Sequence, residues 1–178
     1  TQDRIDQILK ILVPGTLDTL QMVFMASLFS IIIGTVLGII LFITKLDGLK
    51  PNKVIYLVLG SIINIGRSLP FVILIIAIFP LTRLIVGKSI GLEAATVSLT
   101  IAAIPFVARV MESVFSELDI GVIEASKAMG ASDFQIITKV LLPETLQSII
   151  SNITITIINI IGYSAMAGTI GGGGLGDI

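Results

Sequence analysis

The chain has 178 residues, of which 54% are hydrophobic and 13% charged, and its mean hydropathy is +1.08. A soluble domain carries about 45–50% apolar and about 25% charged residues, so this composition favours a membrane domain with roughly four spans of about 20 residues. The net charge of −1 gives no basic field for nucleic acid, and the absence of Cys and His removes the commonest metal ligands and general base. The composition argues against nucleic-acid binding, a metal site and an enzyme.

Two long apolar runs open the chain. The first covers residues 15–43 with Asp18 as its only charge, which predicts a tilted helix or a helix with an extracellular extension. The stretch 44–53 is polar and rich in turn-forming residues, so it ends this span. The second run, 54–81, is interrupted by polar residues just before Pro70. This interruption predicts a broken or bent helix and a candidate site.

Three further segments follow. The run 92–115 gains Arg109 and Glu112 in its second half, which we interpret as a helix that is leaving the membrane. Residues 116–144 mix charged and apolar side chains and predict a water-exposed helical insert. The run 146–170 is long and uncharged, so it predicts a fourth transmembrane helix. A glycine-rich end should stop that helix.

The lysine and arginine residues near the spans predict the orientation, because cytoplasmic loops carry the excess of these residues. One side holds six of them, Lys45, Lys50, Lys53, Arg109, Lys127 and Lys139, and the other holds Arg4, Lys10, Arg83 and Lys88. This bias places the insert in the cytoplasm and the N-terminus outside. We expect residues 1–178 to form one transmembrane domain, an all-α polytopic helical bundle.

The insert contains small residues at a fixed spacing. The letters E-A-S are followed after three residues by G, and after nine more by V-L-L-P. Small side chains on a short helix let its backbone seat closely in a groove on a partner, and glycine suits the left-handed conformation that ends such a helix. The residues of this spacing are Glu124, Ala125, Ser126, Gly130, Val140, Leu142 and Pro143.

This spacing resembles the cytoplasmic EAA loop of prokaryotic ABC importer permeases, which reads E-A-A, three residues, G, nine residues, I-x-L-P. Ser126 and Val140 are conservative departures from that pattern. The resemblance implies a coupling helix that docks in a cleft on an ATP-hydrolysing subunit, with Glu124 at the interface and with Ala125 and Gly130 allowing the fit. The alternative, an ordinary amphipathic helix between two spans, explains single positions but not the whole spacing.

Two more segments narrow the resemblance. Residues 64–71 read N-I-G-R-S-L-P-F and residues 162–168 read G-Y-S-A-M-A-G, and both are similar to segments of methionine-type importer permeases. The glycine-rich stretch 173–176 continues the likeness. That family usually has five spans, so we expect the last span to be missing from this chain.

The same segments supply the candidates for the translocation pathway. An Arg at a helix centre costs about 2.5–3.5 kcal/mol to insert, so it should face a water-filled path or an interface, or else snorkel from a helix end. Small residues let helices approach closely, and simple helix packing is the alternative for each candidate of the last apolar run. The candidates for the pathway or its gate are Arg67, Tyr163, Ser164 and Met166, and those for packing are Gly162 and Gly168.

The resemblance implies a homodimeric permease subunit for methionine, as the D or L enantiomer, in the bacterial plasma (inner) membrane. Its implied partners are a second permease copy, two ATP-binding subunits that hold ATP and Mg, an extracellular or lipoprotein-like substrate-binding protein, and membrane lipid. No cofactor is expected on this chain, because the run 171–174 lacks the Lys-Ser or Lys-Thr of a phosphate-binding loop. The alternatives are a permease for another amino acid or small polar solute, an ion channel, and an inactive fragment or scaffold that lacks the last span.

Overall fold

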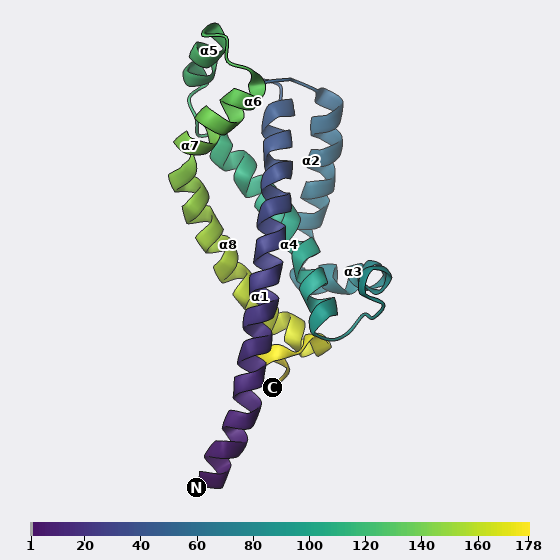
Figure 1. Ribbon diagram of the computed structural model, residues 1–178. Helices are drawn as coiled ribbons and strands as arrows, with labels where there is room; N and C mark the ends of the chain where they lie inside the picture. Colours follow the sequence, from purple (N-terminus) through teal and green to yellow (C-terminus); the bar gives the residue numbers. More distant parts are fainter. Residues whose placement is uncertain (1) are drawn as a thin grey trace.

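The longest helix of the chain is the first one. The computed structural model describes residues 2–178, with side chains from residue 4 onward, and α1 extends over Gln2–Thr44. At 1.5 Å per residue its 43 residues reach about 65 Å, roughly twice the thickness of a bilayer's hydrocarbon core. Its N-terminal part projects beyond the other helices (Figure 1). The helix therefore begins well before the apolar run that predicted it.

α4, Leu92–Phe115, packs along α1 at the centre of the bundle. Its buried side is rich in Ala, and α1 meets it with Gly34 and Gly38, which lie one turn apart. A Cβ atom on Gly38 would lie 2.7 Å from the Met111 Cβ and 2.9 Å from the Ala108 carbonyl oxygen, closer than real Cβ contacts. The two backbones are thus in close contact, as in other membrane helix pairs with small residues at this spacing.

Gly38→Leu is expected to destabilise the bundle by about 1–3 kcal/mol, because the added side chain has no space against α4. The midpoint of thermal unfolding in detergent should therefore fall. The matched control is Val36→Leu, which adds volume to an exposed position of the same helix. Equal midpoints for the two variants would show that α1 and α4 do not pack as closely as described.

The second apolar run forms two helices, α2 over Lys53–Ser68 and α3 over Phe71–Val86. The helix axis bends by 117° between them. Leu69 between them is extended, as the residue before a proline usually is, and Pro70 has no N–H with which to continue α2. The predicted break at this proline is confirmed.

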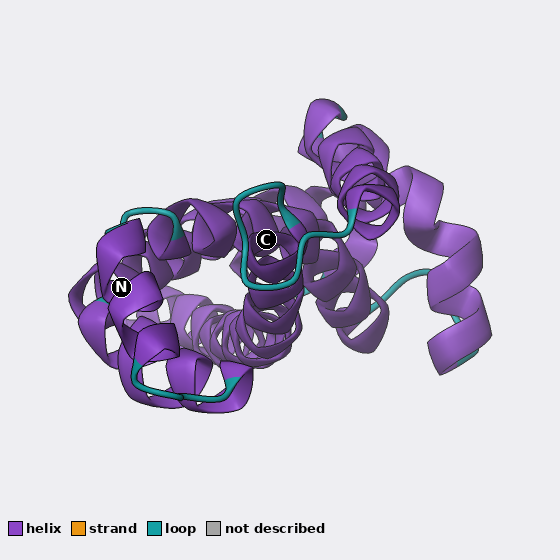
Figure 2. Ribbon diagram, turned by 90° about the horizontal axis from the view of Figure 1, so that it is seen from above, coloured by secondary structure: helices purple, strands orange, loops and turns teal. Residues whose placement is uncertain are grey.

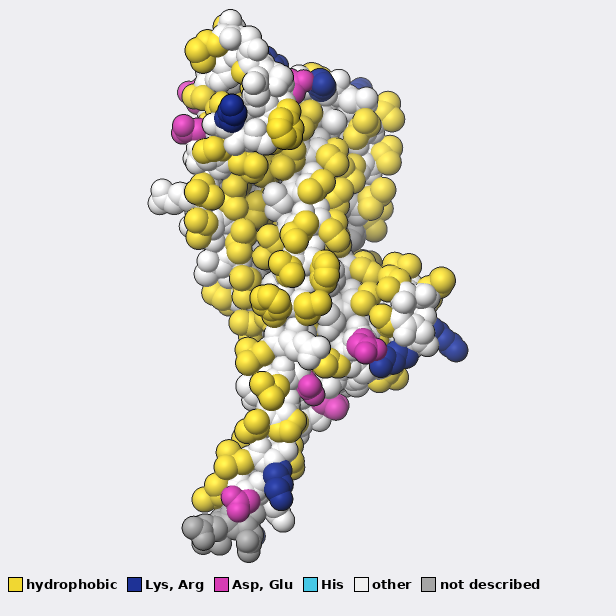
Figure 3. Space-filling model, viewed as in Figure 1, with side chains coloured by type: hydrophobic (Ala, Val, Ile, Leu, Met, Phe, Trp, Pro, Cys, Tyr) yellow, Lys and Arg dark blue, Asp and Glu magenta, His cyan; other side chains and the backbone are white. Residues whose placement is uncertain are grey.

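The described residues form helices and loops without a strand, so the all-α prediction is confirmed (Figure 2). Within residues 2–178, three helices are long and apolar enough to cross a membrane alone, and the bent pair α2 and α3 adds a fourth if it counts as one span. The third of the three is α8, Leu146–Ala167, with the turn that follows it. Apolar side chains cover the middle of the face in Figure 3, and charged ones gather toward its two ends.

The insert between α4 and α8 consists of short helices at one end of the bundle (Figure 1). They are α5, Ile120–Ala128, α6, Asp133–Ile136, and α7, Leu142–Glu144, with a π-helical turn, η1, over Ile137–Leu141. Its apolar side packs with the neighbouring ends of α1 and α4, in a core that contains Phe42, Met111, Phe115, Ile123, Ile136 and Leu141. The insert is therefore anchored to the two central helices.

The glycine-rich end of the chain folds back on α1. It forms a π-helical turn, η2, over Gly168–Gly172 and a 3-10 turn, η3, over Gly174–Asp177. The Leu175 N–H donates a hydrogen bond to the Thr19 hydroxyl at 2.9 Å. The predicted stop of the last long helix in this segment is confirmed.

The second half of α4 does not leave the bundle, which corrects the interpretation of its charges. Glu112 is only 6% exposed and forms an ion pair with Arg109, one turn earlier on the same helix. Both side chains also bond to α2, through Tyr56 and Asn64. The two charges pair with each other on α4 and bond to uncharged side chains of α2.

Candidate functional site

The insert presents a short helix with a sharp end. Asp119 caps α5 by accepting a hydrogen bond from the Gly121 N–H at 2.7 Å, which uses one of the free donors of the first turn. After the helix, Gly130 has a φ of +84°, a conformation that glycine adopts without strain. The prediction that Gly130 ends the helix in a left-handed conformation is confirmed.

The segment after this turn is held by a capping box. The Gln135 N–H donates to the Ser132 hydroxyl, and the Ser132 N–H donates to the Gln135 side-chain oxygen at 2.8 Å. Asp133 lies in the first turn, where the helix dipole favours its charge, and also pairs with Lys50 at 2.9 Å. The capping box fixes the direction of the chain after the turn.

The residues of the predicted coupling loop differ in how far they are buried. Ser126 is buried, and its hydroxyl bonds the Val122 carbonyl of its own helix at 2.8 Å. Glu124, Ala125 and Gly130 are exposed. At the other end of the motif, Leu142 packs on the core and Val140 is half-buried, whereas Pro143 is exposed. The first half of the motif faces out, and part of the second half anchors the insert.

Two large apolar side chains of the insert are also strongly exposed. Met129 is 82% exposed and Phe134 is 74% exposed, although both belong to the charged insert rather than to the apolar middle of the bundle. Sequence reasoning missed both of them. Their exposure could have been inferred from the sequence, because a Met and a Phe lie next to the glycine turn in an insert that was expected to be water-exposed. We group five exposed residues of the insert under the name docking face, as candidates for contact with a partner: Glu124, Ala125, Met129, Gly130 and Phe134.

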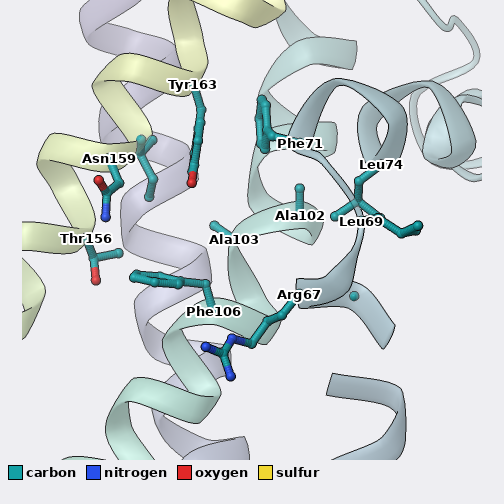
Figure 4. Close-up of a pocket in the computed structure, with 12 residues that line it drawn as sticks. Arg67, Leu69, Phe71, Leu74, Ala102, Ala103, Phe106, Thr156, Asn159 and Tyr163 are labelled. Carbon is teal, nitrogen blue, oxygen red and sulfur yellow. The ribbon is translucent and has the colours of Figure 1, made fainter. Parts of the chain in front are cut away.

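A second site lies at the break between α2 and α3. A cavity of about 180 Å³ opens here between this break, α4 and α8 (Figure 4). The α2–α3 segment supplies Gly66, Arg67, Leu69, Phe71 and Leu74, α4 supplies Ala102, Ala103 and Phe106, and α8 supplies Thr156, Asn159, Ile160 and Tyr163. Three parts of the chain that are far apart in sequence thus line one cavity.

The cavity combines a cation with an aromatic pair. The rings of Phe71 and Tyr163 are stacked, with centroids 4.1 Å apart and an angle of 12° between their planes. Among residues 4–178, Arg67 forms no ion pair with a carboxylate. A guanidinium group binds a carboxylate through parallel hydrogen bonds, and an aromatic ring accepts contacts from apolar groups or thioethers. The cavity therefore offers partners for both ends of an amino acid with an apolar side chain.

The other candidates of the last span have different surroundings. Ser164 is 3% exposed and donates to the Ile161 carbonyl of its own helix at 2.7 Å, so it does not line the cavity. Met166 is half-exposed and also lies outside the lining. A Cβ atom on Gly168 would meet the Gly176 backbone at 2.5 Å, whereas one on Gly162 would meet no described atom within 4 Å. Of the four pathway candidates, Arg67 and Tyr163 line the same cavity, and Arg67 is an exposed residue there.

The chain matches one described protein family and is similar to individual permease proteins. Residues 34–178 match the family described as binding-protein-dependent transport system inner membrane component. A probable D-methionine transport system permease protein of Vibrio cholerae is 52% identical over 168 residues, which cover 94% of this chain and 75% of that protein. The D-methionine transport system permease protein of Escherichia coli is 47% identical over 158 residues, covering 89% and 73%.

Solved structures show the same likeness. An inward-facing structure of the MetNI methionine ABC transporter matches with a TM-score of 0.93 and 46% identity, over 97% of this chain and 80% of that chain. An amino acid ABC transporter with histidines matches with a TM-score of 0.78 at 20% identity, over 98% and 78%, and shows the fold alone.

Proposed function

The chain belongs to the binding-protein-dependent transport system inner membrane components, and from this membership we propose that it carries methionine, as the D or L form, through the bacterial inner membrane. The observation that supports this most strongly is the 46% identity to a methionine ABC transporter chain at a TM-score of 0.93. The permease function and the methionine substrate predicted from the sequence agree with the relatives. The chain is a permease subunit, and ATP hydrolysis belongs to a partner.

The working complex contains a second permease copy and ATPase subunits, by likeness to the solved methionine transporter. We propose further that two ATP-binding subunits hold ATP and Mg, that an extracellular or lipoprotein-like binding protein delivers the substrate, and that lipid surrounds the apolar belt. Exposed Ile and Leu side chains along α1, α2 and α8 support that lipid contact. The exposed backbone at Gly162 leaves space for close approach by the second copy.

We propose that the docking face contacts the ATPase subunit. Exposed Met129 and Phe134 would bury their apolar surface in the cleft of the partner, while Ala125 and Gly130 let the backbone approach. The partly buried Leu142 would transmit force to the bundle, since it packs on the core that joins the insert to α1 and α4. ATP-driven closure of the partner would then rock the membrane helices as rigid bodies.

We propose that the cavity at the helix break is part of the translocation pathway. Arg67 would hold the methionine carboxylate, and the stacked rings of Phe71 and Tyr163 would contact the thioether side chain. Met166, half-exposed on the same helix as Tyr163, is proposed to close the pathway together with the second copy. Ser164 is proposed to support this segment of α8, since its hydroxyl bonds to its own helix.

The orientation follows from the same assignment. We propose that the insert lies in the cytoplasm, where an ATPase would be, and that the N-terminus lies outside. The linker after α1 lies beside the insert, as the Lys50–Asp133 pair shows, so its three lysines are at the same end of the bundle. This grouping agrees with the excess of basic residues on the cytoplasmic side.

Glu124→Lys is expected to weaken the binding of the ATPase subunit about tenfold, which corresponds to about 1.4 kcal/mol. The reversed charge would stand on the docking face while the fold of the exposed helix stays intact. The measurement is a titration of the purified permease with the ATPase subunit. Glu144→Lys, an exposed position of the same insert outside the docking face, is the control, and equal affinities for both variants would remove Glu124 from the interface.

A further inference from the structure

The charged residues of α4 form a compact polar cluster with α2. We propose that Tyr56 and Asn64 of α2, with Arg109 and Glu112 of α4, act as a polar clamp that makes the two helices move as one body during transport. These residues position the part of α2 that carries Arg67. The inference rests on the proposed transport function.

The geometry of the polar clamp is continuous from one helix to the other. The Tyr56 hydroxyl donates to one Glu112 carboxylate oxygen at 3.1 Å, and the Arg109 guanidinium pairs with the other. Arg109 also donates to the Asn64 side-chain oxygen at 2.7 Å. Tyr56, Gly60 and Asn64 lie four residues apart, on one face of α2. A Cβ on Gly60 would lie 3.6 Å from the guanidinium, an ordinary van der Waals distance, so the arginine packs beside this residue.

Apolar packing alone could hold α2 against α4 without the free-energy cost of inserting charged side chains into a membrane. A charge at the centre of a membrane helix costs about 2.5–3.5 kcal/mol to insert, and well-packed apolar side chains often replace a buried ion pair without loss of stability. Directional hydrogen bonds, by contrast, also fix the register between the two helices. A fixed register matters for α2 because only two of its residues, Gly60 and Ile63, are buried.

The polar clamp lies between the insert and the cavity. α4 ends at Phe115, and only four residues separate it from α5. On α2, Asn64 precedes Arg67 by less than one turn, and a Cβ on Gly66 would lie 2.7 Å from a ring carbon of Pro105 on α4. A displacement of the insert would therefore pass along α4 and carry Arg67 with it.

The first test measures coupling in liposomes that contain the permease, its ATPase subunit and a binding protein. Glu112→Ala is expected to lower the methionine transported per ATP hydrolysed by about tenfold. The swap Arg109→Glu with Glu112→Arg should restore most of this ratio, because the Asn64 amide can turn to donate and the Tyr56 hydroxyl can accept.

Glu93→Gln, which removes an exposed carboxylate paired with Lys88, is the control and should leave the ratio unchanged. An unchanged ratio for Glu112→Ala, or a swap variant that assembles but stays defective, would overturn the proposal.

The second test needs no change to the polar clamp. The sequence contains no Cys, so spin labels can be placed at Ile62→Cys on α2 and Ser113→Cys on α4, both exposed positions. The distance between the labels should be the same without nucleotide and with trapped ATP. A distance that changes between the two states would overturn the polar clamp even if methionine transport is normal. Absence of ATP-driven uptake by the unmodified complex would instead contradict the proposed function.

Discussion

Met129→Asp is expected to weaken binding of the ATPase subunit by about a hundredfold, which is about 2.7 kcal/mol. Burying a methionine side chain contributes about 1.5–3 kcal/mol, and an aspartate in its place would have to lose its hydration. Because Met129 is 82% exposed, the change should leave the permease itself folded. The affinity of the ATPase subunit, measured by titration in detergent, checks this expectation.

The matched control for this variant is Leu46→Asp. Leu46 is 78% exposed in the linker between α1 and α2, outside the docking face. It should bind the ATPase subunit as the unchanged chain does. If Met129→Asp binds equally well, the exposed apolar side chains of the insert do not contact the partner, and another surface must couple the two subunits.

Arg67→Leu is expected to reduce methionine uptake by about ten- to a hundredfold while leaving assembly with the ATPase subunit unchanged. A hydrogen bond to a charged group contributes about 1.5–3 kcal/mol, and the substrate carboxylate would lose such partners in the cavity. The measurement is the rate of uptake of radiolabelled methionine with the binding protein at saturation. Arg83→Leu, at an exposed position near the end of α3 and outside the cavity lining, serves as the control. Equal uptake by the two variants would exclude Arg67 as a substrate partner.

Local chemistry explains what the sequence predicted correctly. Pro70 breaks a helix because it lacks an N–H, and Gly130 ends one because it adopts a left-handed conformation without strain. Each of these effects acts over a few residues, so the residue types and their spacing were sufficient.

Contacts between distant parts of the chain explain what the sequence missed. In the sequence, the charges of Arg109 and Glu112 indicated a helix that leaves the membrane. Their bonds to Tyr56 and Asn64 depend on which face α2 turns toward α4, and the sequence does not show that face. The two packing glycines are equivalent in the sequence. Only the returning end of the chain gives Gly168 a close neighbour and leaves Gly162 open.

The docking face was predicted only in part for the same reason. The spacing of Glu124 and Gly130 marked the insert, but exposure of Met129 and Phe134 follows from how α5 and α6 lie on the core. Period and composition do not determine that placement for helices as short as these.

The central claim is that this chain moves methionine only when an ATPase subunit drives it through the insert. The most direct measurement is uptake of radiolabelled methionine into liposomes that contain the permease, its ATPase subunit and a binding protein. We predict accumulation that requires ATP and that is lost in the Met129→Asp variant. Passage of methionine or ions without ATP, as through a channel, or full uptake by that variant would contradict it.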